Sequence, residues 1–439
     1  MSAAEPSGST RGAVSKSFLW VLAAVAILAF GIWIWAFVSG RGGDDLVDAE
    51  DIRPAGRWHY HPEPGPGDPS AEDLARVLSL PYLDAKVVAP ANSGVSVYDL
   101  ERVAPGVNMY VSAHAPEVML MDVDGEILHR WRYTFEEAFP TKKSLPGTEY
   151  FRRAHILPNG DVLAIYQGAG MVKLDFDSRL LWVSDSSFYN DFFVADDGKI
   201  WSIAKRAVTR SDIRPGSNTL EDSIIVLDAQ GNPIETISLL DAFLESDYAG
   251  LIHPLPDVAD IFHTNTIQLM DGSLSTLSPL FGRGVILVSL RQVDIVAFID
   301  PSSKTPLRAW RGPWVMQHEP TVLPNGRLLV FDNRGAEGSS RVLEFDVDSE
   351  ETVWEYRGMP DLPLDSPEAG VAQRLSNGNI LITESERGRA VEITHAGETV
   401  WEFVSPHRGG RNDELIATLW EVVRLTSDQV PFAAPLLRR

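Results

Sequence analysis

The chain has 439 residues, of which 44% are hydrophobic, so it is long enough to bury a large core. Its formal charge of −23, from 38 basic and 61 acidic residues, argues against a surface that follows nucleic-acid phosphates, and no nucleic-acid partner is expected. The chain has no cysteine, which excludes disulfides, thiolate nucleophiles and thiolate metal sites.

The first expected element is a membrane anchor at residues 18–38. This segment is uncharged and apolar, and it is long enough to cross a hydrocarbon layer about 30 Å thick. Basic residues precede it and acidic residues follow it, which places residues 1–17 in the cytoplasm as a short tail. A cleaved signal peptide is the alternative, although its apolar core is usually shorter. The sequence predicts a single-pass protein of the cytoplasmic (inner) membrane, with the rest of the chain periplasmic or otherwise extracytoplasmic.

Residues 39–105 have the composition of an irregular stalk or linker. Glycine, proline and polar residues recur in GRGGDD, HPEPGPGDPS and VAPANSG. Between them, AEDLARVLSLPYLD has room for one short helix.

Residues 106–432 repeat one pattern six times: a strand, a polar turn ending in glycine, a second strand, an acidic turn, and a strand that usually ends in tryptophan. One clear copy reads HEPTVLPNGRLLVFDNRG followed by SRVLEFDVDSEETVWEYR. A four-stranded antiparallel unit of this kind cannot bury both faces alone, and radial closure of about four to eight such units gives a propeller. The sequence therefore predicts an all-β fold, a six-bladed β-propeller preceded by a transmembrane helix and a stalk.

Tryptophan recurs at the same position of the repeat. We expect these side chains to pack between neighbouring blades, because large aromatic residues dominate core burial. They are Trp131, Trp182, Trp310, Trp354 and Trp401.

Candidate functional residues lie near the start of each innermost strand. These strands face the central channel of a propeller, so side chains from distant parts of the sequence should meet there. Three histidines occur among them, together with arginine and amide side chains. The candidates are Arg152, Arg153, His155, Tyr189, Asn190, Asp191, His263, Asn265, His318 and Gln373.

The alternation of side chains along a strand places His263 and Asn265 on one face, where they would present an imidazole and an amide to one ligand. Each residue also has a structural interpretation, in which it only forms local hydrogen bonds at the channel mouth. Arg291 and Arg341 likewise either reach a ligand or lay their stems along the core. Convergence of these residues with His318 on one pocket would favour a functional site.

In these residues and in the order of its repeats, the chain resembles the arylsulfotransferase family of six-bladed propellers. The resemblance covers most of residues 107–404 and is strongest in DIFHTNTIQ, QHEPTVLPNGRLLVFDNRG and QRLSNGNILITE. It implies transfer of a sulfuryl group from a phenolic sulfate ester to another phenol, outside the cytoplasm and without a nucleotide sulfate donor.

The resemblance also implies roles for particular residues. His263 and His318 match two active-site histidines of the family, one of which would be a covalent nucleophile while another protonates the departing oxygen. Charge develops on the leaving phenolate, so cationic and amide donors are required, and Arg341 completes the expected catalytic set. The expected substrate-binding residues are Asn265, Arg291, His155, Arg153 and Tyr189.

The chain departs from the family pattern in two places. The family commonly has a His-His-Asp run where this chain has Tyr189, Asn190 and Asp191. The last blade has Gln373 at a place where a histidine nucleophile would be expected.

Other functions remain open from the sequence alone. One is a non-catalytic propeller that binds a ligand or a protein. Another is a quinone-dependent dehydrogenase, although neither its calcium site nor its cofactor-stacking tryptophan can be identified. A metal site from His263, His318 and a carboxylate has no supporting ligand spacing, so no metal or cofactor is expected. The expected partners are an aryl sulfate, a phenol and the membrane, and a homo-oligomer is left open.

Overall fold

In a computed structural model of the protein, the described residues are 87–144, 147–213, 218–335, 338–410 and 412–438. The expected cytoplasmic tail, the expected anchor at 18–38 and most of the expected stalk lie outside these ranges. Within the described ranges, no helix is long and apolar enough to cross a membrane.

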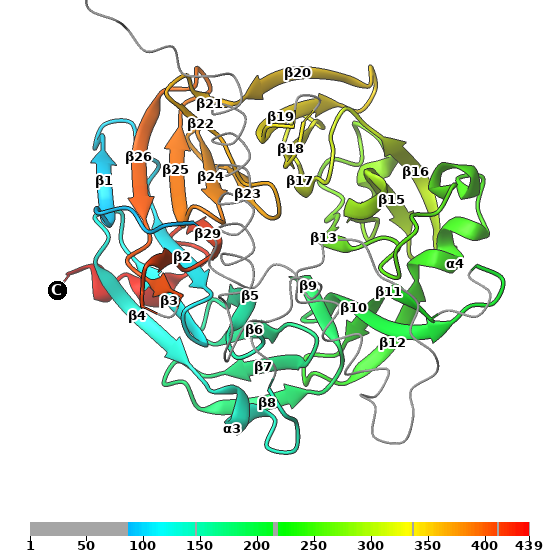
Figure 1. The fold of residues 1–439 in the computed structure, drawn as a ribbon, viewed down its shortest axis with the longest axis horizontal. Coiled ribbons are helices and arrows are strands. Elements are labelled where there is room, and N and C mark those ends of the chain that lie inside the picture. Colours follow the sequence, from blue (N-terminus) through cyan, green and yellow to red (C-terminus); the bar gives the residue numbers. More distant parts are fainter. Residues whose placement is uncertain (1–86, 145–146, 214–217, 336–337, 411, 439) are drawn as a thin grey trace, which may run out of the picture. The chain divides into compact units, whose positions relative to one another are not determined.

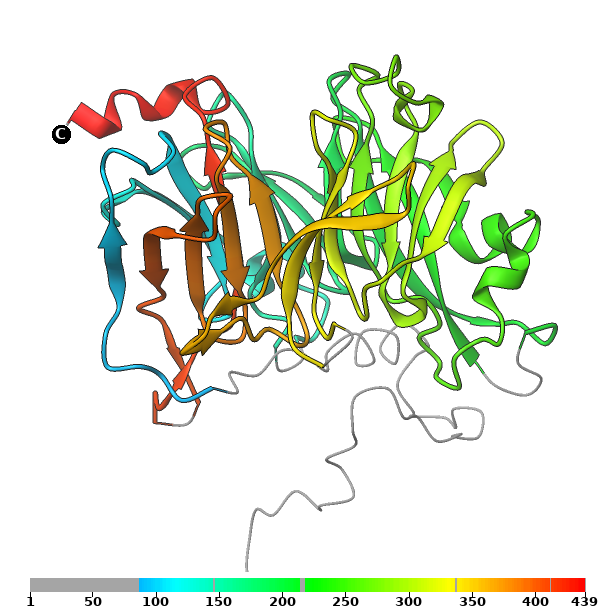
Figure 2. The ribbon, with the colours of Figure 1, turned by 90° about the horizontal axis from the view of Figure 1, so that it is seen from above.

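Six antiparallel sheets surround a central axis, and the chain passes from one sheet to the next around the ring (Figure 1). Figure 2 shows that the strands of the blades run between the two faces of this ring. The prediction of an all-β, six-bladed propeller is therefore confirmed.

The blades have the following strands, each written from the channel outward. The first blade has β29 (Leu419–Leu425), β2 (Val107–Ser112), β3 (Glu117–Met121) and β4 (Ile127–Arg132). The second has β5 (Phe151–Ile156), β6 (Val162–Tyr166), β7 (Gly170–Leu174) and β8 (Leu180–Ser184). The third has β9 (Phe188–Val194), β10 (Ile200–Thr209), β11 (Asn218–Leu227) and β12 (Pro233–Ser238).

The second half of the ring follows the same order. The fourth blade has β13 (Thr264–Leu269), β14 (Ile286–Leu290), β15 (Ile295–Asp300) and β16 (Thr305–Arg311). The fifth has β17 (His318–Val322), β18 (Leu328–Asp332), β19 (Arg341–Asp346) and β20 (Glu351–Tyr356). The sixth has β23 (Val371–Arg374), β24 (Ile380–Glu384), β25 (Arg389–Ile393), β26 (Thr399–Val404) and β1 (Gly94–Tyr98).

Short elements connect the blades. Two hairpins pair β21 (Gly358–Met359) with β22 (Leu362–Pro363), and β27 (Arg408–Gly409) with β28 (Leu415–Ile416). The α-helices are α3 (Phe135–Ala138), whose first turn is capped by Thr134 and Glu137, and α4 (Leu239–Leu244). The 3₁₀ turns are η1 (Ala249–Ile252), η2 (Pro279–Phe281), η3 (Arg291–Val293), η4 (Pro431–Ala433) and η5 (Leu436–Arg438).

The ring is closed by a strand from the end of the propeller sequence. β29 pairs with β2, with Leu425 opposite Val107 and Val422 opposite Tyr110, and it thereby supplies the inner strand of the first blade. The repeat pattern did not predict this pairing, because the two strands lie at opposite ends of residues 106–432. Distant segments of the chain are thus held in one sheet.

The predicted stalk, residues 39–105, includes a strand of the propeller. Residues 94–98, inside the predicted stalk at 39–105, form β1 and pair with β26 at the outer edge of the sixth blade. The stretch GVSVY alternates small or polar residues with valine and tyrosine, and this suits a half-buried edge strand better than a linker. The part of the stalk prediction that covers these residues is corrected accordingly.

The recurring tryptophans link neighbouring blades, as predicted. The indole nitrogens of Trp131, Trp354 and Trp401 donate to backbone carbonyls of the next blade, those of Gly160, His395 and Val123. In the same position, Trp310 donates to the Glu350 carboxylate and Trp182 lies against Gly231. Five of the six blades are therefore fixed to the next blade by a tryptophan ring and, in four cases, by a hydrogen bond, whereas the third blade, whose outer strand reads PIETIS, has no tryptophan at this position.

The inner strands are irregular near their starts. Register shifts interrupt the pairing of β5, β9, β13 and β17 with their neighbours, and also that of β29 with β2. Asn190, His263 and Glu319 have φ angles of 55°, 48° and 50°, in the left-handed region that residues with side chains rarely adopt. Bulges of this kind bend a strand and redirect its side chains, and here they occur where polar residues face the channel.

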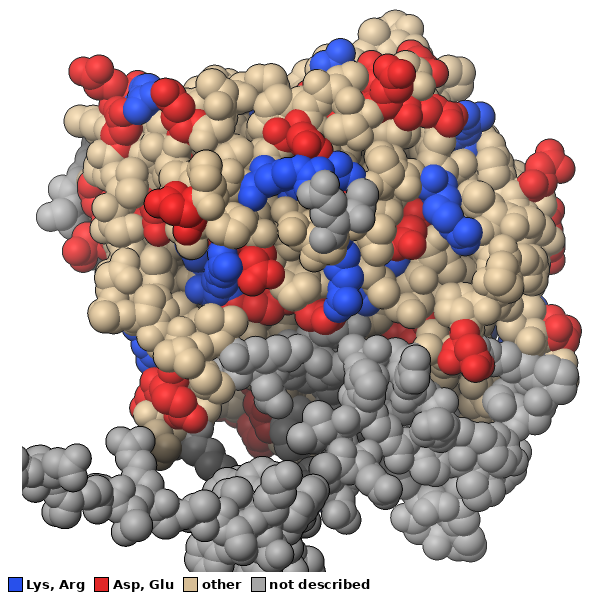
Figure 3. Space-filling view, turned by 45° about the horizontal axis from the view of Figure 1, so that its top comes forward, with Lys and Arg blue, Asp and Glu red and all other residues tan. Residues whose placement is uncertain are grey.

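The surface carries both signs of charge. On the face drawn in Figure 3, lysine and arginine side chains lie among aspartates and glutamates, and the described residues in view form no continuous basic area.

Candidate functional site

Two separate spaces lie along the channel. A small pocket is lined by residues near the starts of the inner strands, whereas a larger cavity of about 540 Å³ is lined by residues further along them. The small pocket holds about 10 Å³, roughly the room of one water molecule. It nevertheless contains the candidate chemistry, because its lining residues are Arg152, Gln167, Asn190, His263, His318, Glu368, Ala369 and Trp420.

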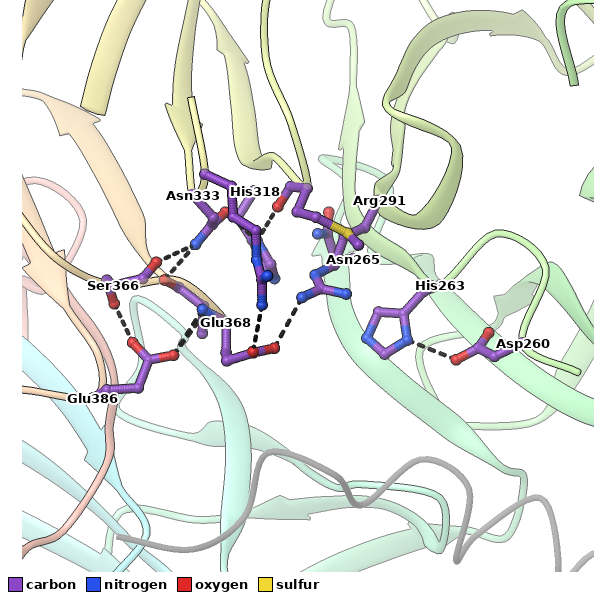
Figure 4. Close-up of polar contacts among 12 residues, drawn as sticks. Asp260, His263, Asn265, Arg291, His318, Asn333, Ser366, Glu368 and Glu386 are labelled. Atoms are coloured by element: carbon purple, nitrogen blue, oxygen red, sulfur yellow. Dashed lines mark hydrogen bonds and ion pairs between the residues drawn. The ribbon is translucent and has the colours of Figure 1, made fainter. Parts of the chain in front are cut away.

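His263 is held by a buried carboxylate. Its Nδ1 lies 2.6 Å from the Asp260 carboxylate (Figure 4), so Nδ1 carries the proton and donates a hydrogen bond to Asp260. Asp260 also accepts from Lys205 at 2.6 Å, and Lys205 is 2% exposed. Nε2 of His263 is left with a lone pair, and the Tyr189 hydroxyl lies 3.3 Å from it.

His318 has its tautomer fixed in a similar way by a neutral partner. The Asn333 amide donates through Nδ2 to the carbonyls of Ser366 and Ala369, at 2.6 and 2.7 Å. Its Oδ1 must therefore face His318, and it lies 2.6 Å from Nδ1 (Figure 4). Nδ1 of His318 is consequently the donor, and Nε2 is the unprotonated nitrogen.

Both histidines are neutral at neutral pH. Burial lowers the pKa of His263 to about 4, although Asp260 acts in the opposite direction. Burial also holds the pKa of His318 well below its usual value, and the nearby Arg291 acts in the same direction. The pocket therefore receives two imidazoles whose Nε2 atoms are available as base or nucleophile.

Two arginines supply positive charge at this pocket. Arg152 stacks on the Trp420 ring at 4.1 Å and makes no hydrogen bond or ion pair with any described residue. Burial lowers the pKa of Arg152 to about 10, at which it remains charged. Arg291, 2% exposed at the start of η3, forms an ion pair with Glu368 at 3.0 Å (Figure 4).

The carboxylate of Glu368 lies at the wall of the small pocket, where it pairs with two arginines. Its two carboxylate oxygens bind Arg291 at 3.0 Å and Arg334 at 2.8 Å. Its backbone N–H and that of Ala369 donate to the buried Glu386 carboxylate, which holds this loop in place. A carboxylate of the chain thus neutralises a guanidinium that would otherwise be available to an anionic ligand.

A cluster of four charged residues separates the two spaces. Arg153 binds Asp191 at 2.8 Å, Glu421 at 3.0 Å and Glu319, so that it joins β5 to β9, β29 and β17. Burial opposes ionisation of Arg153, but the three carboxylates raise its pKa well above the usual value. Burial raises the pKa of Glu319 to about 7, although Arg153 acts against this shift.

The structure brings only part of the predicted set together. His263, His318, Arg291 and Tyr189 lie at or beside the small pocket. Arg153 lies in the charged cluster instead, and His155 lines the larger cavity.

Arg341 does not reach the pocket. Its guanidinium binds Asp332 at 2.8 Å, Glu355 at 2.7 Å and the Pro313 carbonyl at 2.6 Å. The structure therefore does not bring Arg341 together with His263 and His318, which were predicted to act with it. The structural interpretation of this arginine holds, although it is satisfied by an ion-pair network rather than by solvent.

Asn265 does not share a strand face with His263. β13 begins at Thr264 after the irregular His263 backbone, and its register shifts between Thr264 and Thr266. The amide of Asn265 is engaged by the Gln317 carbonyl and by the Thr266 hydroxyl. The simple alternation used for the prediction fails because a bulge interrupts it.

Several residues of the site were missed. Asp260 precedes His263 by three residues, a local signal that was not used, and Asn333 lies within the FDNRG stretch. Trp420 could have been found only by assigning β29 to the first blade. Lys205, which supports Asp260, gives no signal in the sequence because the contact joins different blades.

The sequence model described as arylsulfotransferase (ASST) matches residues 153–406. The chain belongs to the arylsulfotransferase family. No curated protein matches it. All the residues of the small pocket except Arg152 and Trp420 lie within the matched range, so both histidines of the pocket belong to the family domain.

Solved propellers resemble this family member only distantly. A protein of unknown function from Bacteroides caccae is 14% identical over 73% of this chain and 98% of that chain, with a TM-score of 0.48. A streptogramin B lyase is 14% identical over 78% of this chain and 96% of that chain, with a TM-score of 0.43. Apo AztD from Citrobacter koseri is 12% identical over 74% of this chain and 98% of that chain, with a TM-score of 0.40. Likenesses at this level carry no information on chemistry.

The described residues of this arylsulfotransferase family member contain no group of three or more histidine, aspartate, glutamate or cysteine side chains arranged to hold a metal ion. The His263–Asp260 and His318–Asn333 pairs are each complete without one, since both Nδ1 atoms have a protein partner.

Proposed function

We propose that this chain transfers a sulfuryl group from a phenolic sulfate ester to a second phenol, with His318 as the covalent nucleophile and His263 as the acid–base group. The observation that carries the proposal is the joint placement of two imidazoles of fixed tautomer with a guanidinium, Arg152, that stacks on Trp420 but makes no hydrogen bond or ion pair with a described residue. Family membership supports an aryl sulfate and a phenol as the substrates.

His318 suits the role of nucleophile. Its Nε2 is unprotonated because Nδ1 is committed to the Asn333 oxygen. Attack of Nε2 on sulfur forms an S–N bond and breaks the S–O bond to the donor phenol. The leaving phenolate and the sulfuryl oxygens develop negative charge, which Arg152 and Arg291 are placed to stabilise.

His263 suits proton transfer because its imidazolium form is paired with a carboxylate. A sulfate-ester anion in the pocket would favour that form, and the imidazolium then protonates the departing phenolate. In the second half-reaction neutral Nε2 takes the proton of the acceptor phenol, whose oxygen attacks sulfur and releases His318. The Tyr189 hydroxyl, 3.3 Å from this nitrogen, indicates that a phenolic oxygen fits within hydrogen-bond reach.

A sulfate ester with a good leaving group tests the roles assigned to His318 and His263. With 4-nitrophenyl sulfate, we expect burst release of 4-nitrophenol and a mass increase of one SO₃ group on His318, located by mass spectrometry. His318→Ala should abolish the adduct and lower kcat by more than about 100-fold. His263→Ala should still form the adduct, because 4-nitrophenolate leaves without protonation, but should transfer it slowly to a phenol.

His395→Ala is the matched control, because His395 is an exposed histidine on the sixth blade and should leave activity unchanged. An adduct on His263 would exchange the two roles. Absence of both adduct and burst in the full chain would remove the proposal and leave a propeller that binds without catalysis.

We also propose that residues 18–38 anchor the protein in the cytoplasmic membrane, with the propeller on the outer side. The support is the uncharged length of this segment and the charge difference between its flanks. The full chain should sediment with membranes at alkaline pH, and protease added to spheroplasts should degrade the propeller. Release of a soluble, shortened chain would instead indicate a cleaved signal peptide.

A further inference from the structure

The larger cavity of about 540 Å³ has no role in the proposed reaction. It lies beyond the Arg153 cluster, among residues of the later parts of β5, β9, β17, β23 and β29. Its volume is within the range of about 300 to 1,000 Å³ that is typical of small-molecule sites. Because the cluster joins four inner strands between the two spaces, a molecule here would not contact His263 or His318.

The wall of this cavity is mostly apolar, with a few polar groups that have no partner. Phe192, Val322, Leu323 and Val423 are among the apolar lining residues. His155 makes no hydrogen bond within the described residues, and its ring packs edge-on against Phe192 at 6.4 Å. The His155 side chain is exposed to the cavity, and its neutral ring can accept or donate a hydrogen bond.

Two hydroxyl groups add to this set. Thr321 and Ser376 line the cavity, and neither side chain has a hydrogen-bond partner among the described residues. Gln373 and Arg374, in contrast, are already engaged. Gln373 binds the backbone of Arg424 in both directions, and Arg374 binds Glu344 and the Gly378 carbonyl.

The charges at the base of the cavity disfavour an anion. Three carboxylates, those of Asp191, Glu319 and Glu421, surround Arg153, and Arg152 lies on the far side of the cluster. The pKa of Glu319 is raised to about 7 by burial, so this group is partly protonated at neutral pH, which reduces the negative charge of the cluster without removing it. A sulfate ester would meet carboxylates without a free cation, whereas a cation would have to give up its hydration in a mostly apolar cavity.

We propose that this cavity is a second small-molecule site, separate from the histidine pocket, which takes an uncharged aromatic compound bearing a hydroxyl group. The aromatic body would pack against Phe192 and the aliphatic wall, and the hydroxyl would bond to His155 or Thr321. The inference does not depend on transferase activity, because it concerns binding alone.

Binding of 2-naphthol to the full chain tests the proposal, with the substitution His318→Gln to prevent turnover. Isothermal titration calorimetry should detect a site that survives this substitution. Thr321→Phe, which fills the cavity, should weaken binding at least about tenfold, whereas Thr321→Val, which keeps its volume, should change it less than about threefold. His155→Leu should weaken binding about five- to tenfold through the lost hydrogen bond.

The charge of the ligand provides a second comparison. 2-Naphthyl sulfate and 2-naphthylmethylammonium should each bind this site more weakly than 2-naphthol, and Thr321→Phe should not alter what binding remains. The melting temperature of each variant shows whether it is folded, and His155→Leu serves if Thr321→Phe is not. Undetectable 2-naphthol binding, binding insensitive to both cavity variants, or tighter binding of either charged analogue would overturn the proposal.

Discussion

At the scale of single residues, the tautomers of His263 and His318 are each fixed by a hydrogen-bond partner, a carboxylate in one case and a neutral amide in the other. Asn333 and Asp260 differ in charge, but both accept a hydrogen bond from Nδ1, which leaves each Nε2 unprotonated in the neutral ring. The proposed roles follow this difference, because a carboxylate stabilises an imidazolium and an amide does not. The charge of Glu368 also matters, because its carboxylate neutralises Arg291 beside the pocket.

Glu368→Gln should improve binding of the sulfate ester. The substitution removes a negative charge that competes with the substrate for Arg291 and Arg334, and one such ion pair is worth about 1 kcal/mol, or roughly fivefold in affinity. Steady-state kinetics should show a several-fold lower KM for the donor. Glu398→Gln, at an exposed turn of the sixth blade, is the control and should leave KM unchanged. A higher KM for Glu368→Gln would show that this carboxylate assists substrate binding.

At the scale of elements, β29 and β1 both add to sheets formed by distant residues, but they differ in importance. β29 is an inner strand, and it brings Trp420 and Glu421 to the channel. β1 is the outermost strand of the sixth blade, and its residues are half-buried or exposed. Losing an inner strand opens a buried face and unpairs the Arg153 cluster, whereas losing an edge strand does neither.

A chain ending at Thr418 should therefore fail to fold, whereas a chain beginning at Leu100 should keep the propeller. Circular dichroism should show a cooperative thermal transition for the second chain, with a modestly lower melting temperature, and none for the first. Comparable melting of both chains would mean that the ring closes without β29.

The repeat pattern was sufficient to predict the blades, because each blade is built from local hairpins whose turns are visible in the sequence. The tryptophan contacts followed from the same pattern, since each lies at an equivalent position. The bulges could not be predicted, and for that reason the shared face of His263 and Asn265 was wrong. Contacts between blades, such as Lys205 with Asp260 or Arg341 with its two carboxylates, depend on spatial neighbours that no local pattern reveals.

At the scale of the whole molecule, burial of ionisable groups connects stability to pH. Burial lowers the pKa of five histidines, those at positions 114, 129, 263, 318 and 407. The unfolded chain binds protons at these groups near pH 6.5 while the folded chain does not, so the folded state is destabilised as the pH falls below 6.5. Five carboxylates with raised pKa values, those of Asp222, Asp294, Glu319, Glu386 and Glu421, act in the opposite direction, but the shift is large only for Asp222 and Glu319, to about 6 and 7.

The melting temperature should accordingly be lower at pH 5 than at pH 7. Differential scanning calorimetry at constant ionic strength checks this, because the loss arises from proton uptake rather than from screening. His407→Phe should reduce the difference between the two melting temperatures, since it removes one of the titrating groups. An equal or higher melting temperature at pH 5 would show that the carboxylates dominate.

Closure of the ring by β29 has a consequence for biosynthesis. During translation the segments carrying His263 and His318 leave the ribosome well before residues 419–425 do, so the first blade waits without its central strand while the other five can already form their hairpins. Until that strand arrives, Arg153 has one carboxylate fewer and Arg152 has no ring to stack on. The small pocket is therefore completed only after residues 419–425 have been made, later than both histidines that line it.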